Sequence, residues 1–176
     1  MLAGDVEVAQ LEVDHGSVTV TPPVGWQLIA DTPAALGTGH ALHLMSYVHT
    51  VGASEPLSYT WKVNPASWVD IGIVAYGGVN GTNPVDAAAG ADLGITSQAV
   101  APAVTTTAPN DLVIGLFTSF GYCSWSAGSG MTKRYNFDAN AAADQVVASS
   151  GTIVAASGSC TLSSNEAAQT VALRAA

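Results

Sequence analysis

Five carboxylic acids are the side chains of this 176-residue chain best suited to acid–base chemistry on a sugar bond. Cleavage of a glycosidic bond needs two such acids facing each other across a cleft, roughly 5 to 10 Å apart. No recognisable sequence signature accompanies any of the five, so the sequence predicts no catalytic residue and no enzyme. The five acids are Glu7, Glu12, Glu55, Asp70 and Glu166.

Histidine and serine patterns also lack a functional arrangement. His40 and His43 lie an odd number of positions apart in a predicted strand, so their side chains point to opposite faces and cannot share a metal without a bend. Ser129 lies in Ala-Gly-Ser-Gly, which lacks the Gly-x-Ser-x-Gly spacing of a nucleophile elbow. The sequence therefore predicts neither a transition-metal centre nor a serine nucleophile.

Acidic and amide side chains in the middle of the chain offer hard oxygen ligands. Asp86 and Asp92 follow Asn80 and Asn83, and such groups can bind calcium. The segment lacks the regular alternation of an established calcium loop. Turn capping is therefore the preferred interpretation, calcium at Asp86 and Asp92 is the alternative, and no other cofactor is predicted.

Three aromatic residues are candidate contact or glycan anchors, because sugar rings stack on exposed aromatic faces. Trp68 is out of phase with the apolar positions that follow it, and Tyr122 and Trp125 lie in a Gly/Ser-rich loop over 121–130. Trp26 and Trp61 fall on inward-facing positions of alternating segments and are expected in the core.

The two cysteines, Cys123 and Cys160, leave two interpretations open. They are either small buried apolar residues or the two ends of one disulfide.

Charged residues make up only 10% of the chain, and the net charge is −9. Nucleic-acid binding requires clustered cations that displace counterions from phosphates, and four scattered Lys and Arg residues cannot supply them. The same argument excludes an anionic membrane surface. No stretch approaches the roughly 20 apolar residues of a transmembrane helix.

Period-2 alternation dominates the chain, and helix signals are nearly absent, which predicts an all-β protein. Residues 57–63 give the clearest half-buried strand, and a change of phase near Ala9 indicates a bulge. In segment 68–76, Ile71 and Ile73 are assigned to the inward face. The expected core includes Val8, Trp26, Leu44, Trp61, Ile73, Leu112, Ile114 and Val171.

The chain opens twice in a similar way. An apolar run after Asp5 leads to Gly25, 20 residues later, and another after Asp111 leads to Gly130, 19 residues later. This weak repeat predicts a single domain over 1–176 made of two interleaved antiparallel sheets. Its halves, about 4–79 and 110–174, are joined by a loop over 77–93.

Turn and core motifs spread over nearly the whole chain carry a resemblance to a known class of domain. The string Thr-Pro-Pro-Val-Gly-Trp over 21–26, Tyr-Thr-Trp over 59–61, Asn-Pro-Val-Asp over 83–86 and Gly-Met-Thr-Lys-Arg-Tyr over 130–135 carry it. They resemble the jelly-roll-like β-sandwich domain of phage virion proteins (head decoration and tail fibre) and bacterial surface proteins. The resemblance implies a non-enzymatic module.

Such domains usually carry a further strand before the Gly-Asp that stands here at 4–5. The resemblance therefore implies either that another subunit or the C-terminal end supplies this strand, or that a sheet edge near the N-terminus is open. Val6 and Val8 form the candidate edge-pairing segment, and residues 1–14 are expected at or near the edge. The region before Asp5 shows no signal peptide.

These observations favour a phage virion structural protein, specifically a capsid decoration protein on the head surface. A carbohydrate-binding adhesin or a tail-fibre module is the alternative, and a polysaccharide-degrading enzyme on the same scaffold is a third. We expect a capsid or other virion protein as partner, a homo-oligomer with a trimer preferred, and location on the virion surface. The alternative location is extracellular, on a cell surface.

Overall fold

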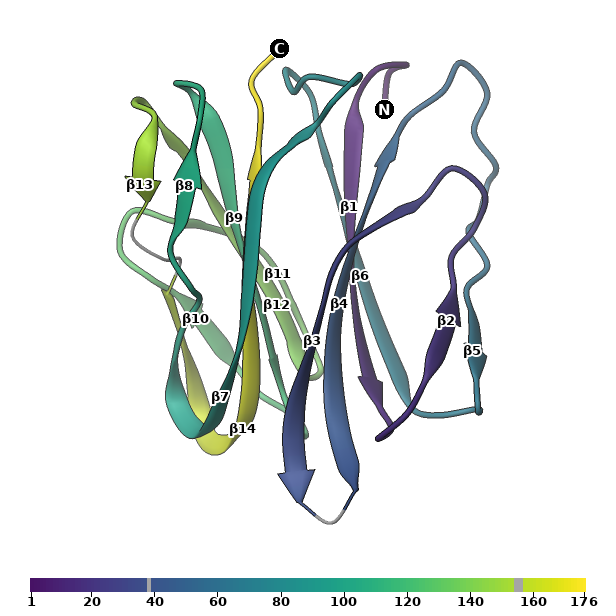
Figure 1. The fold of residues 1–176 in the computed structure, drawn as a ribbon, viewed down its shortest axis with the longest axis vertical. Helices are drawn as coiled ribbons and strands as arrows, with labels where there is room; N and C mark the ends of the chain where they lie inside the picture. The colour runs from purple at the N-terminus through teal and green to yellow at the C-terminus, as the bar shows by residue number, and fades with distance from the viewer. Residues whose placement is uncertain (38, 154–156) are drawn as a thin grey trace.

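The computed structural model describes residues 1–37, 39–153 and 157–176, and two antiparallel sheets packed face to face dominate it (Figure 1). None of the described residues forms a helix of the length and apolarity that crossing a membrane would require. The all-β prediction is confirmed. The first sheet has the order β3 (Gln27–Gly37), β4 (His40–Thr50), β1 (Val6–Asp14) and β6 (Val69–Tyr76).

The second sheet is built around β14, which pairs with β7, β9 and β10. Its strands are β7 (Val85–Val100), β14 (Ser157–Leu173), β9 (Asp111–Ser119), β12 (Asn140–Val147), β11 (Thr132–Phe137) and β10 (Trp125–Ala127). Two short ribbons complete the fold. They are β2 (Thr19–Thr21) with β5 (Lys62–Asn64), and β8 (Val104–Thr106) with β13 (Gly151–Ile153).

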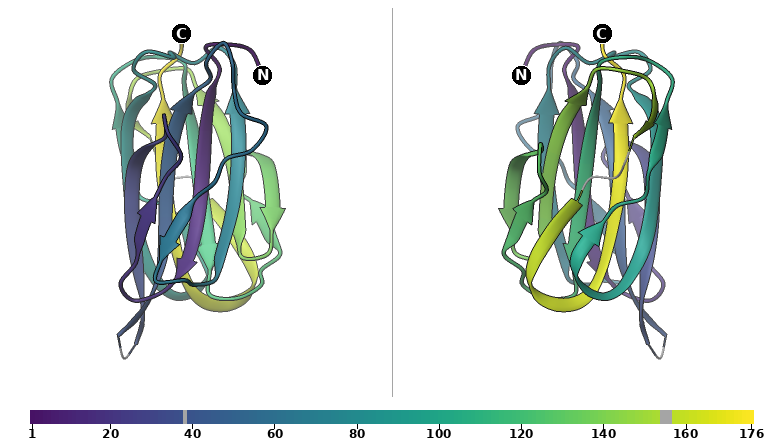
Figure 2. Two further views of the ribbon diagram at one scale, coloured as in Figure 1. Left: turned by 90° about the vertical axis from the view of Figure 1, so that its right-hand side faces the viewer. Right: turned by 90° about the vertical axis from the view of Figure 1, so that its left-hand side faces the viewer.

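Each ribbon covers the outer face of one sheet, so the molecule has more than two layers (Figures 1 and 2). Val20 and Val63 of the β2–β5 ribbon pack against a buried cluster that includes Leu11 and Val13 of β1. Because the outer face of β1 is covered in this way, the strand is buried on both faces through residue 13.

The two sheets divide the chain in sequence. The first sheet takes strands from residues 6–76 and the second from residues 85–173, so the interleaved jelly-roll arrangement expected from the sequence is not what these strand orders show. The order β3-β4-β1-β6 in the first sheet has the same form as β11-β12-β9-β14 in the second. In these orders β1 of the first sheet corresponds to β9 of the second, and both lie in the interior, whereas β7 lies at the edge of the second sheet next to β14.

The predicted edge position of the N-terminal segment is wrong. β1 pairs with β4 on one side and with β6 on the other, in continuous register from Val6 to Val13, so it also lacks the expected bulge near Ala9. Val6 and Val8 are buried between the sheets and contribute to the central core. Their backbone groups are already paired on both sides, so they cannot receive a strand from a partner.

Most of the expected buried residues are confirmed, in the central core between the two sheets and in smaller clusters beside it. Val8, Trp26, Leu44, Ile114 and Val171 are buried. The remaining members of the expected core differ. Trp61 and Leu112 are half-buried, and Ile73 is 39% exposed.

The inward face of β6 is opposite to the predicted one. Val74 and Tyr76 point into the core, whereas Ile71 and Ile73 face out. Gly72 explains this choice, because a Cβ atom there would come within 2.4 Å of the Tyr135 ring from the second sheet. The inward face of β6 is therefore the one on which the sequence leaves room for that ring.

Two predicted segments have a different local structure. The connection 77–93 is not a loop throughout, because β7 starts at Val85 and pairs along β14. Residues 57–61 lie outside any strand, and Leu57 is fully exposed. Tyr59 and Trp61 nevertheless pack against the cluster that covers β1. The alternation therefore predicted the burial of Tyr59 and Trp61 correctly, but it was wrong about Leu57 and about strand pairing.

Candidate functional site

A hollow of about 240 Å³ opens at the end of the sandwich opposite the two chain termini, the lower end in Figure 1. It forms where β1 ends, β6 begins, β11 turns into β12, and the chain leaves β9. We call it the acidic depression. It is lined by Glu12, Asp14, Trp68, Asp70, Phe120, Gly121, Asp138 and Ala139.

Two carboxyl groups lie side by side in the acidic depression. Glu12 and Asp70 are direct partners in the register of β1 and β6, a geometry that places Cβ atoms about 4.5–5.5 Å apart. They are only 3% and 6% exposed. Glu12 Oε2 and Asp70 Oδ2 are buried and have no hydrogen-bond partner among the described residues. Such oxygens are costly to bury unless a donor reaches them.

Burial and crowding raise the pKa values of both acids. Desolvation raises the pKa of Glu12 to about 8, and the charges of Asp70, Asp14 and Asp138 add to this. The pKa of Asp70 is also raised, first by desolvation and then by Asp138, while donors on Ala139 and Trp68 oppose the rise. Glu12 is therefore protonated at neutral pH.

The acid at position 138 is held by a tight turn. Asp138 lies between β11 and β12 with φ of 46°, a left-handed conformation that Asp tolerates better than most residues. Its carbonyl oxygen accepts a hydrogen bond from the Cys123 amide at 3.1 Å. The next carbonyl, that of Ala139, accepts the indole N–H of Trp125 at 2.9 Å. The turn therefore has fixed partners on both residues.

Two hydrogen bonds of its backbone fix the position of Phe120. Its amide donates to the Asn165 carbonyl at 2.8 Å, and its carbonyl accepts from Ser164 Oγ at 2.6 Å. Gly121 follows with φ of 95°, a conformation that favours glycine. Of the two interpretations of the cysteines, the structure has the disulfide, Cys123–Cys160, which ties the same loop to β14.

Trp68 stands at the opposite wall, just before β6. Its carbonyl accepts the Asp14 amide at 3.3 Å, and Ser67 Oγ donates to the Asp14 carbonyl at 2.5 Å. Asn140 of the second sheet donates to the Asp70 carbonyl at 3.2 Å. The side chain of Trp68 remains 66% exposed, although its carbonyl and the neighbouring Ser67 are bonded to Asp14.

The predicted anchors separate into three cases. Trp68 is exposed and lines the acidic depression. Tyr122 is equally exposed but is not part of the lining. Trp125 is wrong as a surface anchor, because it is 2% exposed and stacks on Phe117 at a centroid distance of 5.6 Å.

The acidic depression continues into a neighbouring hollow of about 380 Å³. Asp14 and Phe120 line both hollows, and His40 lines the neighbouring one. Together they provide room for a ligand longer than a single ring.

The other candidate acids lie elsewhere. The Tyr59 hydroxyl lies 2.8 Å from a Glu7 oxygen and 2.9 Å from a Glu55 oxygen, and its one hydrogen can be donated to either. His49 Nε2 lies 3.1 Å from Glu55. Glu166 is fully buried, and desolvation raises its pKa to about 7. Only Glu12 and Asp70, of the five acids considered from the sequence, line a common hollow.

The two acids considered for calcium bind protein groups. Asp86 forms an ion pair with Arg174 at 2.7 Å and accepts a hydrogen bond from Thr107. Asp92 accepts the backbone amides of Ala35 and Gly94 at 3.0 and 2.8 Å. Within residues 1–37, 39–153 and 157–176, no three His, Cys, Asp or Glu side chains are grouped as a metal site would require.

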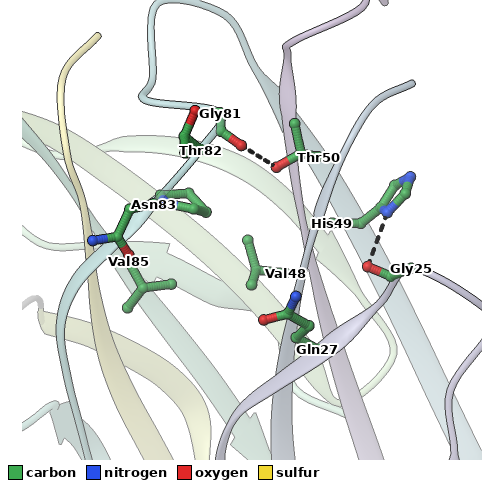
Figure 3. A pocket seen from close by; sticks show the side chains of 10 residues that line it. Gly25, Gln27, Val48, His49, Thr50, Gly81, Thr82, Asn83 and Val85 are labelled. Carbon is green, nitrogen blue, oxygen red and sulfur yellow. Dashed lines mark hydrogen bonds between the residues drawn. The ribbon is translucent and has the colours of Figure 1, made fainter. Parts of the chain in front are cut away.

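A second hollow, of about 360 Å³, lies at the opposite end of the sandwich (Figure 3). Its polar side chains are already engaged in part. Thr50 donates to the Gly81 carbonyl at 2.8 Å, and His49 Nδ1 lies 3.2 Å from the Gly25 carbonyl. Its lining includes no carboxylate and no Trp, Tyr or Phe among the described residues. The acidic depression has the stronger chemistry.

No family model, curated protein or solved structure matches the chain. The chemistry of the acidic depression is therefore the basis for a functional proposal. The sequence did not single out Asp14, Phe120 or Asp138 as site residues. The dipeptide Asp138-Ala139 between two alternating segments could have indicated a turn. It could not have indicated that this turn lies in the same hollow as Trp68.

Proposed function

We propose that this protein is a non-enzymatic glycan-binding module of a phage virion or a cell surface, and that the acidic depression is its binding site. The observation that carries the proposal is the pairing of an exposed indole, Trp68, with unpartnered buried oxygens of Glu12 and Asp70. A sugar presents a flat C–H face to an aromatic ring and hydroxyl donors at its rim.

The relation between the two acids supports binding over hydrolysis. Glu12 and Asp70 are neighbours on one sheet, so both approach a ligand from the same side. Glycoside hydrolysis needs two carboxyl groups on either side of the scissile bond.

A glycan array followed by calorimetry tests this function. Trp68→Ala should weaken binding of the best array ligand about tenfold or more, since stacking is worth about 1 kcal/mol beyond the buried area. Val146→Ala is the matched control, because Val146 is also 66% exposed and lies outside the acidic depression. Unchanged binding by Trp68→Ala would contradict the site. Release of reducing sugar from the bound polysaccharide would contradict the non-enzymatic role.

Capsid decoration is the second candidate, and β6 favours it. This strand ends the first sheet and pairs with β1 alone among the described strands. Ile71 and Ile73 are exposed beside this free edge. A capsid protein could add a strand here, in place of the Val6–Val8 segment expected from the sequence. Co-sedimentation with capsids that is lost in Ile73→Lys, and kept in Val146→Lys, would support this role.

A further inference from the structure

We propose that the group bound between Glu12 and Asp70 is the protonated amine of an amino sugar. This inference rests on the proposed glycan-binding function and specifies the class of glycan. It implies that polymers with free amino groups bind and that their N-acetylated forms bind weakly.

The number of hydrogens is the first argument. Glu12 Oε2 and Asp70 Oδ2 are two buried acceptors without donors. A sugar hydroxyl has one hydrogen to donate, and so has an N-acetyl group, whereas a primary ammonium has three. One ammonium can therefore satisfy both oxygens and still reach a third acceptor, which Asp14 or Asp138 can supply.

The charge of the walls is the second argument. Four carboxyl groups line the acidic depression, and no Lys or Arg side chain belongs to its described lining. Lys133 donates to the Trp125 carbonyl, while Arg134 and Arg174 are ion-paired with other acids. Lys62 is exposed on β5 and lies outside this lining. Because none of the protein's four cations lines the acidic depression, a ligand cation is the species that would offset this charge.

The aromatic walls are the third argument. Trp68 and Phe120 line the same hollow as the carboxyl groups. A cation near an aromatic face gains about 0.5–2 kcal/mol, with Trp the most favourable ring. Carboxylates and aromatic rings together recognise an ammonium better than either does alone.

Proton release distinguishes this ligand from a neutral sugar. Glu12 keeps its proton at neutral pH in the free protein because of burial and because Asp14, Asp70 and Asp138 surround it. Two histidines also lie near Asp14: His40 lines the neighbouring hollow with it, and His15 follows it in the sequence. At pH 5.5 the amine of the ligand is already protonated in solution, so it takes up no further proton on binding. An ammonium placed against Glu12 favours the carboxylate, so binding at pH 5.5 should release up to one proton, and a neutral sugar should release none.

Calorimetry on the full chain tests the inference with a β-1,4-linked glucosamine tetramer and its fully N-acetylated counterpart. At pH 5.5, in two buffers of different ionisation enthalpy, the amine form should bind at least tenfold tighter and release a proton. Glu12→Gln should abolish the proton release and weaken the amine form about tenfold. Glutamine resembles the protonated acid, so this variant should fold, and circular dichroism checks that it does. Val146→Ala should match the wild type.

The other outcomes separate the two proposals. Equal binding of both tetramers that depends on Trp68 would overturn the amine inference and leave glycan binding intact. If neither tetramer binds and the array shows no Trp68-dependent ligand, both proposals fail. Binding of the amine form that persists in Glu12→Gln and disappears at high salt would reflect the net charge of −9 alone and would overturn the inference. Stoichiometric Ca²⁺ binding that displaces the tetramer would also overturn it.

Discussion

Replacing Glu12 by glutamine should leave the stability near pH 4.5 almost unchanged and raise it progressively up to pH 9. Burial and the neighbouring acids raise the pKa of Glu12 from its ordinary 4.5 to about 8 in the folded protein. One pKa unit corresponds to about 1.36 kcal/mol, so the difference between the two states is worth about 3–5 kcal/mol. This is a large part of the stability of a typical domain.

Stability falls with rising pH because the folded protein holds the Glu12 proton more tightly than the unfolded chain does. Below pH 4.5, Glu12 is protonated in both the folded and the unfolded chain and costs nothing. As the pH rises, the unfolded chain loses this proton first, whereas the folded protein keeps it until about pH 8. Wild-type stability should therefore fall between pH 4.5 and 8 and level off above. Glutamine cannot titrate, so the stability of Glu12→Gln should not show this decrease between pH 4.5 and 8.

Urea denaturation followed by circular dichroism at pH 4.5, 6, 7.5 and 9 measures the effect as the difference between the two proteins. Glu166→Gln is the matched control, since it also removes a buried acid with a raised pKa, and its gain should be complete about one pH unit earlier. A difference between wild type and Glu12→Gln that stays constant over this range would refute the reasoning. It would show that Glu12 is charged in the folded protein or open to water.

Trp125→Ala should lower the free energy of unfolding by about 3–5 kcal/mol, because it leaves a cavity in the core. Trp68→Ala should change the free energy of unfolding by less than about 1 kcal/mol. Equal losses of stability in urea denaturation would contradict the assignment of Trp125 to the core and Trp68 to the surface. Replacing Cys123 and Cys160 together by serine should cost about 2–4 kcal/mol, since a disulfide spanning 37 residues restricts the unfolded chain, and an unchanged midpoint would argue against the bond. Glu55→Gln should lower stability at pH 7 and have little effect at pH 3. In the folded protein the Gly52 amide and then Tyr59 lower the pKa of Glu55, and this contribution is lost as the pH falls through that pKa. A loss that is the same at both pH values would contradict it.

The fold class could be predicted from the sequence because alternation is a local property. Trp26, Leu44 and Ile114 all stand in alternating segments, and each is buried as expected. The pairing of strands could not be predicted, because it depends on partners far away in the chain. β1 has apolar residues on both faces, and its sequence does not tell whether it is an edge strand or an interior strand.

The inward face of β6 could not be predicted from the sequence of that strand alone either. Ile71 and Ile73 alternate with Val74 and Tyr76 as two apolar faces, and alternation cannot choose between them. Gly72 was the informative residue, but its meaning depends on Tyr135, more than 60 residues later. The acidic depression has the same origin, because the Glu12–Asp70 pair exists only through the register of β1 with β6.

The acidic depression is not a requirement of the sheet architecture. The sheets share a strand order, and aligning Asp5 with Asp111 places Thr118 and Ala167 of the second sheet where Glu12 and Asp70 stand in the first. Thr118 and Ala167 are fully buried, and neither carries a charge. An uncharged pair of side chains is therefore compatible with this cross-strand position. The first sheet places two carboxyl groups there at a cost in desolvation, and buried acids with raised pKa values in a hollow are typical of functional sites, which supports the ligand-binding role proposed above.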